Sequence, residues 1–141
     1  MIEVVNRQRH RSVDNERWRQ FAGKALAKIG AGGEGAVIVF VSDRTMRGLN
    51  HKFRGRHDAT DVLSFPAAQS EFEKLAEASL GDVVISVERA AAQAAEHDLS
   101  FDNEVEQLIL HGLLHLCGYD HERDDGEMNR LELRLRRRLG I

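Results

Sequence analysis

The strongest constraint on the fold lies in one segment, HGLLHLCGYDH, which spans residues 111–121. His111 and His115 are four residues apart, so on a helix their side chains share one face, one turn from each other. Gly118 stands where a left-handed residue would end that helix and turn the chain, which can bring His121 back to the same point. Three converging imidazoles without a fourth protein ligand are typical of a catalytic zinc site, which keeps one position open for water. The segment therefore predicts a metal site at the C-terminal end of a buried helix.

The spacing of the three histidines equals that of the metzincin metalloproteases, H-E-x-x-H-x-x-G-x-x-H, with one difference. The glutamate that acts as general base in those proteases is replaced by Gly112. Asp120 and Glu122 are the nearest carboxylates in the sequence that can take the proton, although Asp120 is better suited to orient a ligating imidazole. Histidines can reach this spacing by chance on a surface, but the glycine and the third histidine both fall in register. The metal prediction is therefore stronger than the peptidase prediction.

The composition is that of one small globular domain, residues 1–141. With 141 residues, of which 42% are hydrophobic, the chain is long enough to bury a core. We find no apolar run of membrane-spanning length, and the first residues lack the basic start and apolar stretch of a signal peptide. Cys117 is the sole cysteine, so no internal disulfide can form. We interpret it as a core residue of a protein that works in the reducing cytoplasm.

Hydrophobic periodicity predicts an α+β (mixed α/β) fold with a mixed sheet of about four strands and helices on both faces. The segment 36–42 is almost continuously apolar, as in a strand that is covered on both sides. Pro66 indicates a strand end or a sheet edge. Residues 67–79 show little periodicity, and we expect a mobile connection there. The other expected strands are 2–6, 62–65 and 80–85, and the expected helices follow Ser12 or Asp14, Asp43, Ser86, Ser100 and Asp124.

Each expected helix follows a polar residue that can cap its first turn. Asp43 precedes a helix whose inward stripe includes Met46 and Phe53. Asp124 with Glu127 resembles a capping box for the last helix. Val105, Leu108, Ile109 and Leu116 make the helix that carries the histidines largely buried, so packing can hold the metal ligands in place.

The three-histidine segment also resembles the signature of the YbeY family, and two further segments strengthen the resemblance. They are RGRHDATDVLSFP at residues 54–66 and LGDVVIS at residues 80–86. In the same order and at similar spacing, the three segments extend the resemblance over residues 36–139, most of the chain. The family consists of bacterial single-strand-specific endoribonucleases that mature ribosomal RNA. The resemblance implies a fold of the predicted class.

The resemblance implies a zinc-dependent endoribonuclease whose ion is held by His111, His115 and His121. It also implies a natural target, the 3′ end of 16S ribosomal RNA, a role in ribosome quality control, and the ribosome or its small subunit as partner. The arginine that acts in catalysis in the family corresponds to Arg54. This assignment suits the chemistry, because phosphodiester hydrolysis builds negative charge and a planar guanidinium fits a phosphate with two contacts.

A formal net charge of −3 argues by itself against nucleic-acid binding, but the cations are unevenly distributed. Residues 44–57 contain no acidic side chain. Their lysine and arginines are Arg44, Arg47, Lys52, Arg54 and Arg56. Such a local positive field can bind phosphates on an acidic protein, and we predict that the four besides Arg54 contact the RNA backbone in a salt-dependent way. We interpret a second cluster, residues 134–138, as a solvated helix face whose cations suit a helix C-terminus.

Two other functions stay open at this point. A metzincin-like metalloprotease would use the same three histidines, but Gly112 and the basic stretch count against it. A non-catalytic ribosome assembly factor with a structural zinc is the third interpretation, and it suffers from the lack of an evident fourth protein ligand. Three imidazoles also suit nickel, cobalt and copper, so the metal is open as well. The oligomeric state is not indicated by any pattern.

Overall fold

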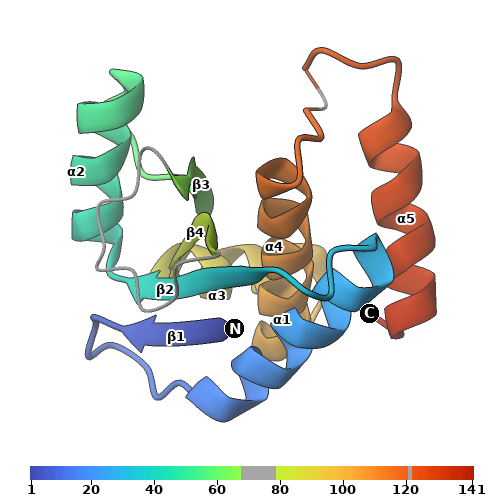
Figure 1. Cartoon of the computed structure of the whole chain (residues 1–141). Helices are drawn as coiled ribbons and strands as arrows, with labels where there is room; N and C mark the ends of the chain where they lie inside the picture. The colour runs from blue at the N-terminus through green and yellow to red at the C-terminus, as the bar shows by residue number, and fades with distance from the viewer. Residues whose placement is uncertain (68–78, 121) are drawn as a thin grey trace.

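The computed structural model describes residues 1–67, 79–120 and 122–141, which form four strands and five helices (Figure 1). The strands are β1 (Ile2–Asn6), β2 (Gly35–Val41), β3 (Val62–Pro66) and β4 (Ser79–Ser86). The helices are α1 (Asn15–Ile29), α2 (Asp43–Arg54), α3 (Val87–His97), α4 (Phe101–Leu116) and α5 (Glu127–Leu139). The predicted α+β fold with a four-stranded mixed sheet is confirmed.

The sheet has the strand order β1-β2-β4-β3, in which β1, β2 and β4 run parallel and β3 pairs antiparallel with β4. β3 is thus an edge strand, as Pro66 predicted, because proline has no N–H for a central ladder. Gly81 lies opposite Pro66 in that ladder with φ +141°. A Cβ at Gly81 would lie 2.1 Å from the carbonyl oxygen of Phe65, so only glycine fits there.

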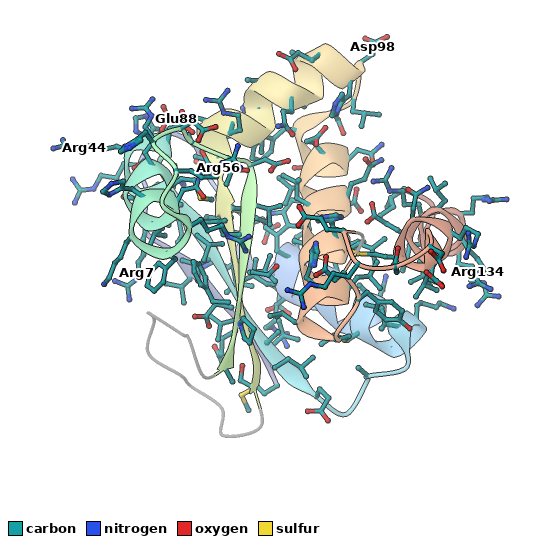
Figure 2. The ribbon with its side chains drawn as sticks, turned by 90° about the horizontal axis from the view of Figure 1, so that it is seen from above. Arg7, Arg44, Arg56, Glu88, Asp98 and Arg134 are labelled. Atoms are coloured by element: carbon teal, nitrogen blue, oxygen red, sulfur yellow. The ribbon has the colours of Figure 1, made fainter. Side chains whose placement is uncertain are left out.

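Successive side chains of β2 point to opposite faces of the sheet, so they belong to two separate hydrophobic cores. Ile38 and Phe40 face the larger core, which α1, α3, α4 and α5 complete. Val37 and Val39 face the smaller core, which Met46 of α2 covers. Figures 1 and 2 show α2 on one side of the sheet and α4 and α5 on the other. Helices therefore cover both faces, as the near-continuous apolar run of β2 predicted.

The predicted helix starts are confirmed at α1, α3 and α4. The side chains of Asp14, Ser86 and Ser100 each accept a hydrogen bond from a backbone N–H of the first turn. The prediction for α2 is wrong by one residue, because Ser42 accepts the N–H of Thr45 at 3.2 Å and is the cap. Asp43 is then the first helical residue, where its charge complements the helix dipole.

The start of α5 also differs from the predicted capping box, because the helix begins at Glu127 after Gly126. Gly126 has φ +94° and supplies no side-chain cap. Asp124 still serves the helix, since its Oδ2 accepts the N–H of Met128 at 2.9 Å. Glu127 accepts the N–H of Asp125 at 2.6 Å. Asp124 therefore accepts one free N–H of the first turn from outside the helix, whereas Glu127, the first residue of α5, accepts an N–H of the preceding loop.

The expectation that Phe53 faces inward is wrong, because 36% of its surface is exposed. Its ring meets Phe65 of the edge strand edge-on, with 5.0 Å between centroids, and no further strand of the described residues follows β3 in the sheet to cover it. Asn50 is buried instead, and its Nδ2 donates to the carbonyl oxygen of Asp58 at 2.8 Å. Most of the connection predicted at residues 67–79 lies outside the described residues. No helix of the described segments combines the length and apolarity needed to cross a membrane.

Candidate metal centre and its cleft

α4 holds His111 and His115 on one face near its end, as the spacing predicted. Their Nε2 atoms are 3.2 Å apart, and the two rings meet at 77° with centroids 4.7 Å apart. A tetrahedral zinc with ordinary Zn–N bonds keeps two ligating nitrogens about 3.3 Å apart. The separation of the two Nε2 atoms therefore fits a single zinc ion that both imidazoles bind.

The turn after α4 leads the chain towards the third predicted ligand. Gly118 has φ +98°, its N–H donates to the carbonyl oxygen of His115, and the N–H of Tyr119 donates to that of Leu114 at 3.1 Å. This pattern ends the helix, as predicted for Gly118. His121 lies outside the described residues, so its place as third ligand stays a prediction.

Glu132 of α5 fixes the orientation of His111, a role that the sequence did not reveal. Its Oε1 lies 2.7 Å from Nδ1 of His111, and its Oε2 accepts a hydrogen bond from Arg136. Burial alone would raise the pKa of Glu132, but the hydrogen bond from His111 and the charges of His111 and Arg136 hold that pKa below its ordinary value. An ionised carboxylate 2.7 Å from Nδ1 of His111 accepts a hydrogen bond from that nitrogen, which turns Nε2 towards the side on which a metal would bind.

The described contacts of Asp120 do not involve His111, so they do not show the predicted orienting role for that imidazole. Oδ1 of Asp120 accepts the N–H of Glu122 at 3.0 Å, and Oδ2 lies 3.4 Å from Nε of Arg123. A signal for Glu132 was present in the sequence, since this carboxylate lies beside the inward stripe of α5 that includes Met128 and Leu135. Only the packing of α5 on α4 shows which imidazole it meets.

A cleft of about 820 Å³ opens over the two histidines. Its walls come from the end of α2, the loop that follows, β3, the end of α4 and the turn after it. Arg54, Arg56, Asp120 and Glu122 all line it. The C-terminal cap of α2 supports this arrangement: Gly55 has φ +67° and ends the helix directly after Arg54. The predicted catalytic arginine and two of the three predicted metal ligands therefore share one cleft.

The other predicted cations divide into two groups. Arg56 lines the cleft, with its Nε 3.7 Å from Oδ1 of Asp58. Arg44, Arg47 and Lys52 are not among the residues that line it. Arg44 and Arg47 lie on the same face of α2 as Arg54 but about 15 and 10 Å before it along the helix axis, whereas the helix period turns Lys52 to another face. The cleft thus brings together two of the five cations that we predicted to contact RNA.

Close packing of α4 explains why Gly112 stands where the metzincin pattern has a glutamate. A Cβ at this position would lie 2.5 Å from Cγ1 of the buried Val83 and 3.2 Å from Oγ of Ser64. Ser64 also donates a hydrogen bond to the carbonyl oxygen of Gly112 at 3.2 Å. The backbone of α4 therefore lies directly against β3 and β4, and this contact leaves no room for a catalytic glutamate at residue 112.

Cys117 packs against the larger core as a partly buried side chain. Burial raises the pKa of its thiol, and the charge of Glu34 adds to the shift. Because the thiolate is the nucleophile and the metal ligand, a raised pKa disfavours both roles. These observations agree with the prediction of a core residue.

Comparison with known proteins decides the family. A family model described as Endoribonuclease YbeY matches residues 3–140. The chain belongs to the YbeY family. A relative of that name from Koribacter versatilis is 41% identical over 138 residues, which cover 98% of this chain and 86% of the relative. Another YbeY from Geobacter metallireducens is 37% identical over 136 residues, which cover 96% and 91%.

The fold of this YbeY family member also has a solved counterpart. The solution structure of a protein from Thermotoga maritima matches it with a TM-score of 0.66 and 25% sequence identity, over 99% of this chain and 89% of that protein. The family resemblance drawn from three sequence segments is thus confirmed, and the proteins that share it are named as endoribonucleases.

Proposed function

We propose that this chain is a metal-dependent endoribonuclease that hydrolyses single-stranded RNA, with zinc held by His111, His115 and His121. The observation that carries the proposal is the 3.2 Å separation of the two described Nε2 atoms in a cleft that Arg54 also lines. The names of its relatives support the reaction class, since they are endoribonucleases. Gly112 argues against the metalloprotease alternative, because the packing of α4 on Val83 excludes the glutamate that would serve as base.

The residues of the cleft divide the chemistry between them. Zinc, when bound, supplies Lewis acidity and activates water near neutral pH. Arg54 binds the non-bridging phosphate oxygens and stabilises the negative charge that develops on them. Asp120 and Glu122 line the same cleft and are the carboxylates available to take a proton. Glu132 holds the proton of His111 on Nδ1 and so keeps Nε2 directed at the metal.

The natural substrate in this proposal is ribosomal RNA, at the 3′ end of 16S rRNA, bound on the small ribosomal subunit in the cytoplasm. The resemblance to the YbeY family supports this part of the proposal. Little base recognition is expected, because the described residues that line the cleft include one aromatic side chain besides the histidines, Tyr119. RNA phosphates, contacted by Arg54 and Arg56, then supply most of the binding.

The reaction class is tested with labelled single-stranded RNA and casein as parallel substrates of the purified protein. We expect zinc-dependent cleavage of RNA, loss of that cleavage with a chelator, its return when zinc is restored, and no cleavage of casein. Cleavage of casein instead of RNA would establish the metalloprotease interpretation. RNA that is left intact in the presence of zinc would favour the non-catalytic assembly factor.

Substitution of Glu132 by glutamine tests how His111 is oriented. The change keeps the size of the side chain but removes the charge that pairs with Nδ1 of His111. We expect zinc affinity to fall about 10- to 100-fold, as is typical when the partner of a ligating histidine is lost. Competition with a chromogenic chelator measures the affinity. Glu96→Gln, an exposed change on α3, is the control, and equal affinities for the two variants would contradict the assigned role.

A further inference from the structure

The cations of α2 that do not reach the cleft still form a regular array. At 100° per residue, Arg44, Arg47, His51 and Arg54 fall within an arc of about 80° on one face of the helix. All four are exposed, whereas Met46, about 120° from the middle of this arc, is buried. The array is about 15 Å long at the rise of an α-helix. We call these four side chains the α2 track.

Positive charge dominates the α2 track. Asp43 is the sole carboxylate of α2, and its Oδ2 is shared between Arg47 at 3.5 Å and Arg89 at 3.3 Å. Arg44 makes no ion pair with any other residue in the described ranges. Two arginines thus compete for one carboxylate while a third projects into solvent, so the track keeps an excess of positive charge.

The two ends of the α2 track lie at different places on the molecule. Arg54 lines the cleft over the histidines. Arg44 lies at the start of α2, where the parallel strands end, and Arg7 follows β1 at that same edge, with its N–H donating to the carbonyl oxygen of Phe40 at 2.9 Å. Figure 2 shows Arg44 and Arg7 on the α2 side of the molecule and Arg134 of α5 on the opposite side. The track therefore leads from the cleft to the sheet edge near Arg7, where Glu88 also lies and accepts the N–H of Asp43 at 2.9 Å.

We propose that single-stranded RNA leaves the cleft along the α2 track, whose side chains hold its phosphates outside the cleft. The proposal rests on the proposed function and extends it, since it assigns a path to the part of the substrate that is not being cut. Phosphate contacts of this kind carry no sequence information. They make long strands bind better than short ones and increase the dependence of binding on salt.

The test compares two RNAs and two double variants by fluorescence anisotropy, read before cleavage begins. The probes are labelled single-stranded RNAs of about 6 and about 20 nucleotides, one near the lower end and one above the upper end of the usual range of single-strand site sizes. Arg44→Gln/Arg47→Gln removes two charges from the track. Arg134→Gln/Arg137→Gln removes the same number from exposed positions of α5. Thermal unfolding confirms that both variants are folded.

We expect Arg44→Gln/Arg47→Gln to bind the long RNA about tenfold more weakly near physiological salt and to lose most of the advantage of the long strand over the short one. The slope of log K against log salt should fall by about 1.4, which corresponds to two single-strand phosphate contacts. The α5 variant should retain both the affinity and the slope. An equal loss of RNA affinity in both variants, or no loss in the α2 variant, would contradict the proposed RNA path along the α2 track. If the wild type binds long RNA through Arg44 and Arg47 but does not cut it, the proposed function is wrong. The proposed RNA path along the α2 track would then still hold.

Discussion

Arg54→Glu is expected to reduce RNA cleavage at least about a hundredfold while zinc content stays at the wild-type level. The guanidinium lines the cleft that holds His111 and His115. Removal of one group that stabilises developing negative charge typically costs about 10²–10³ in rate, and a reversed charge also repels the phosphate. Single-turnover cleavage of labelled RNA and metal analysis of the same preparation measure the two quantities.

Two further variants make the role of Arg54 specific. Arg54→Lys keeps the charge but loses the planar fork, so we expect an intermediate rate. Arg134→Glu makes the same charge reversal on the exposed face of α5 and should cut RNA at the wild-type rate. If zinc is lost together with activity in Arg54→Glu, the arginine supports the structure of the site and the assigned chemical role is wrong.

Gly112→Ala is expected to destabilise the protein by about 1–3 kcal/mol, the usual cost of forcing an extra methyl group into a packed core. The new Cβ would lie 2.5 Å from Cγ1 of Val83, a stiff β-branched side chain that is fully buried. α4 must then move away from β4, which also displaces His111. Urea unfolding followed by circular dichroism measures the change in the free energy of unfolding.

The controls separate this contact from the general effect of a glycine in a helix. A Cβ at Gly23 of α1 would have no described atom within 4 Å outside the neighbouring backbone of its own helix, so Gly23→Ala should stabilise by about 0.5–1 kcal/mol. Val83→Ala removes the group that the new methyl at residue 112 would meet, so Gly112→Ala should cost less in that background. Equal costs in both backgrounds would show that the contact with Val83 is not the reason for glycine at residue 112.

Local chemistry made much of the fold predictable. Gly30, Asp98 and Gly118 end their helices in left-handed conformations, and Ser86 and Ser100 begin theirs through side-chain hydrogen bonds. The sheet edge at Pro66 follows from the missing N–H of proline. Each of these features depends on a few neighbouring residues, so a single sequence is sufficient to indicate it.

The features that were missed depend on contacts between distant segments. Glu132 meets His111 across 21 residues, and its place beside the inward stripe of α5 could not show which side chain it meets. The periodicity of α2 placed Phe53 on the inward face, but it could not show that β3 is the edge of the described sheet. The basic stretch 44–57 was interpreted as one surface, although only its end reaches the cleft, because Arg44 and Arg47 lie two to three turns before Arg54 along α2. Tertiary arrangement decides such points.

One paired measurement tests the central claim most directly: bound zinc and RNA cleavage in the wild type, His115→Ala and the control His10→Ala. His10 is an exposed histidine whose side chain lies 3.4 Å from Glu88, so its removal leaves the cleft intact. We predict that the wild type and His10→Ala bind one zinc ion and cut single-stranded RNA, and that His115→Ala does neither. RNA cleavage at the wild-type rate by a His115→Ala protein that lacks zinc would contradict the account.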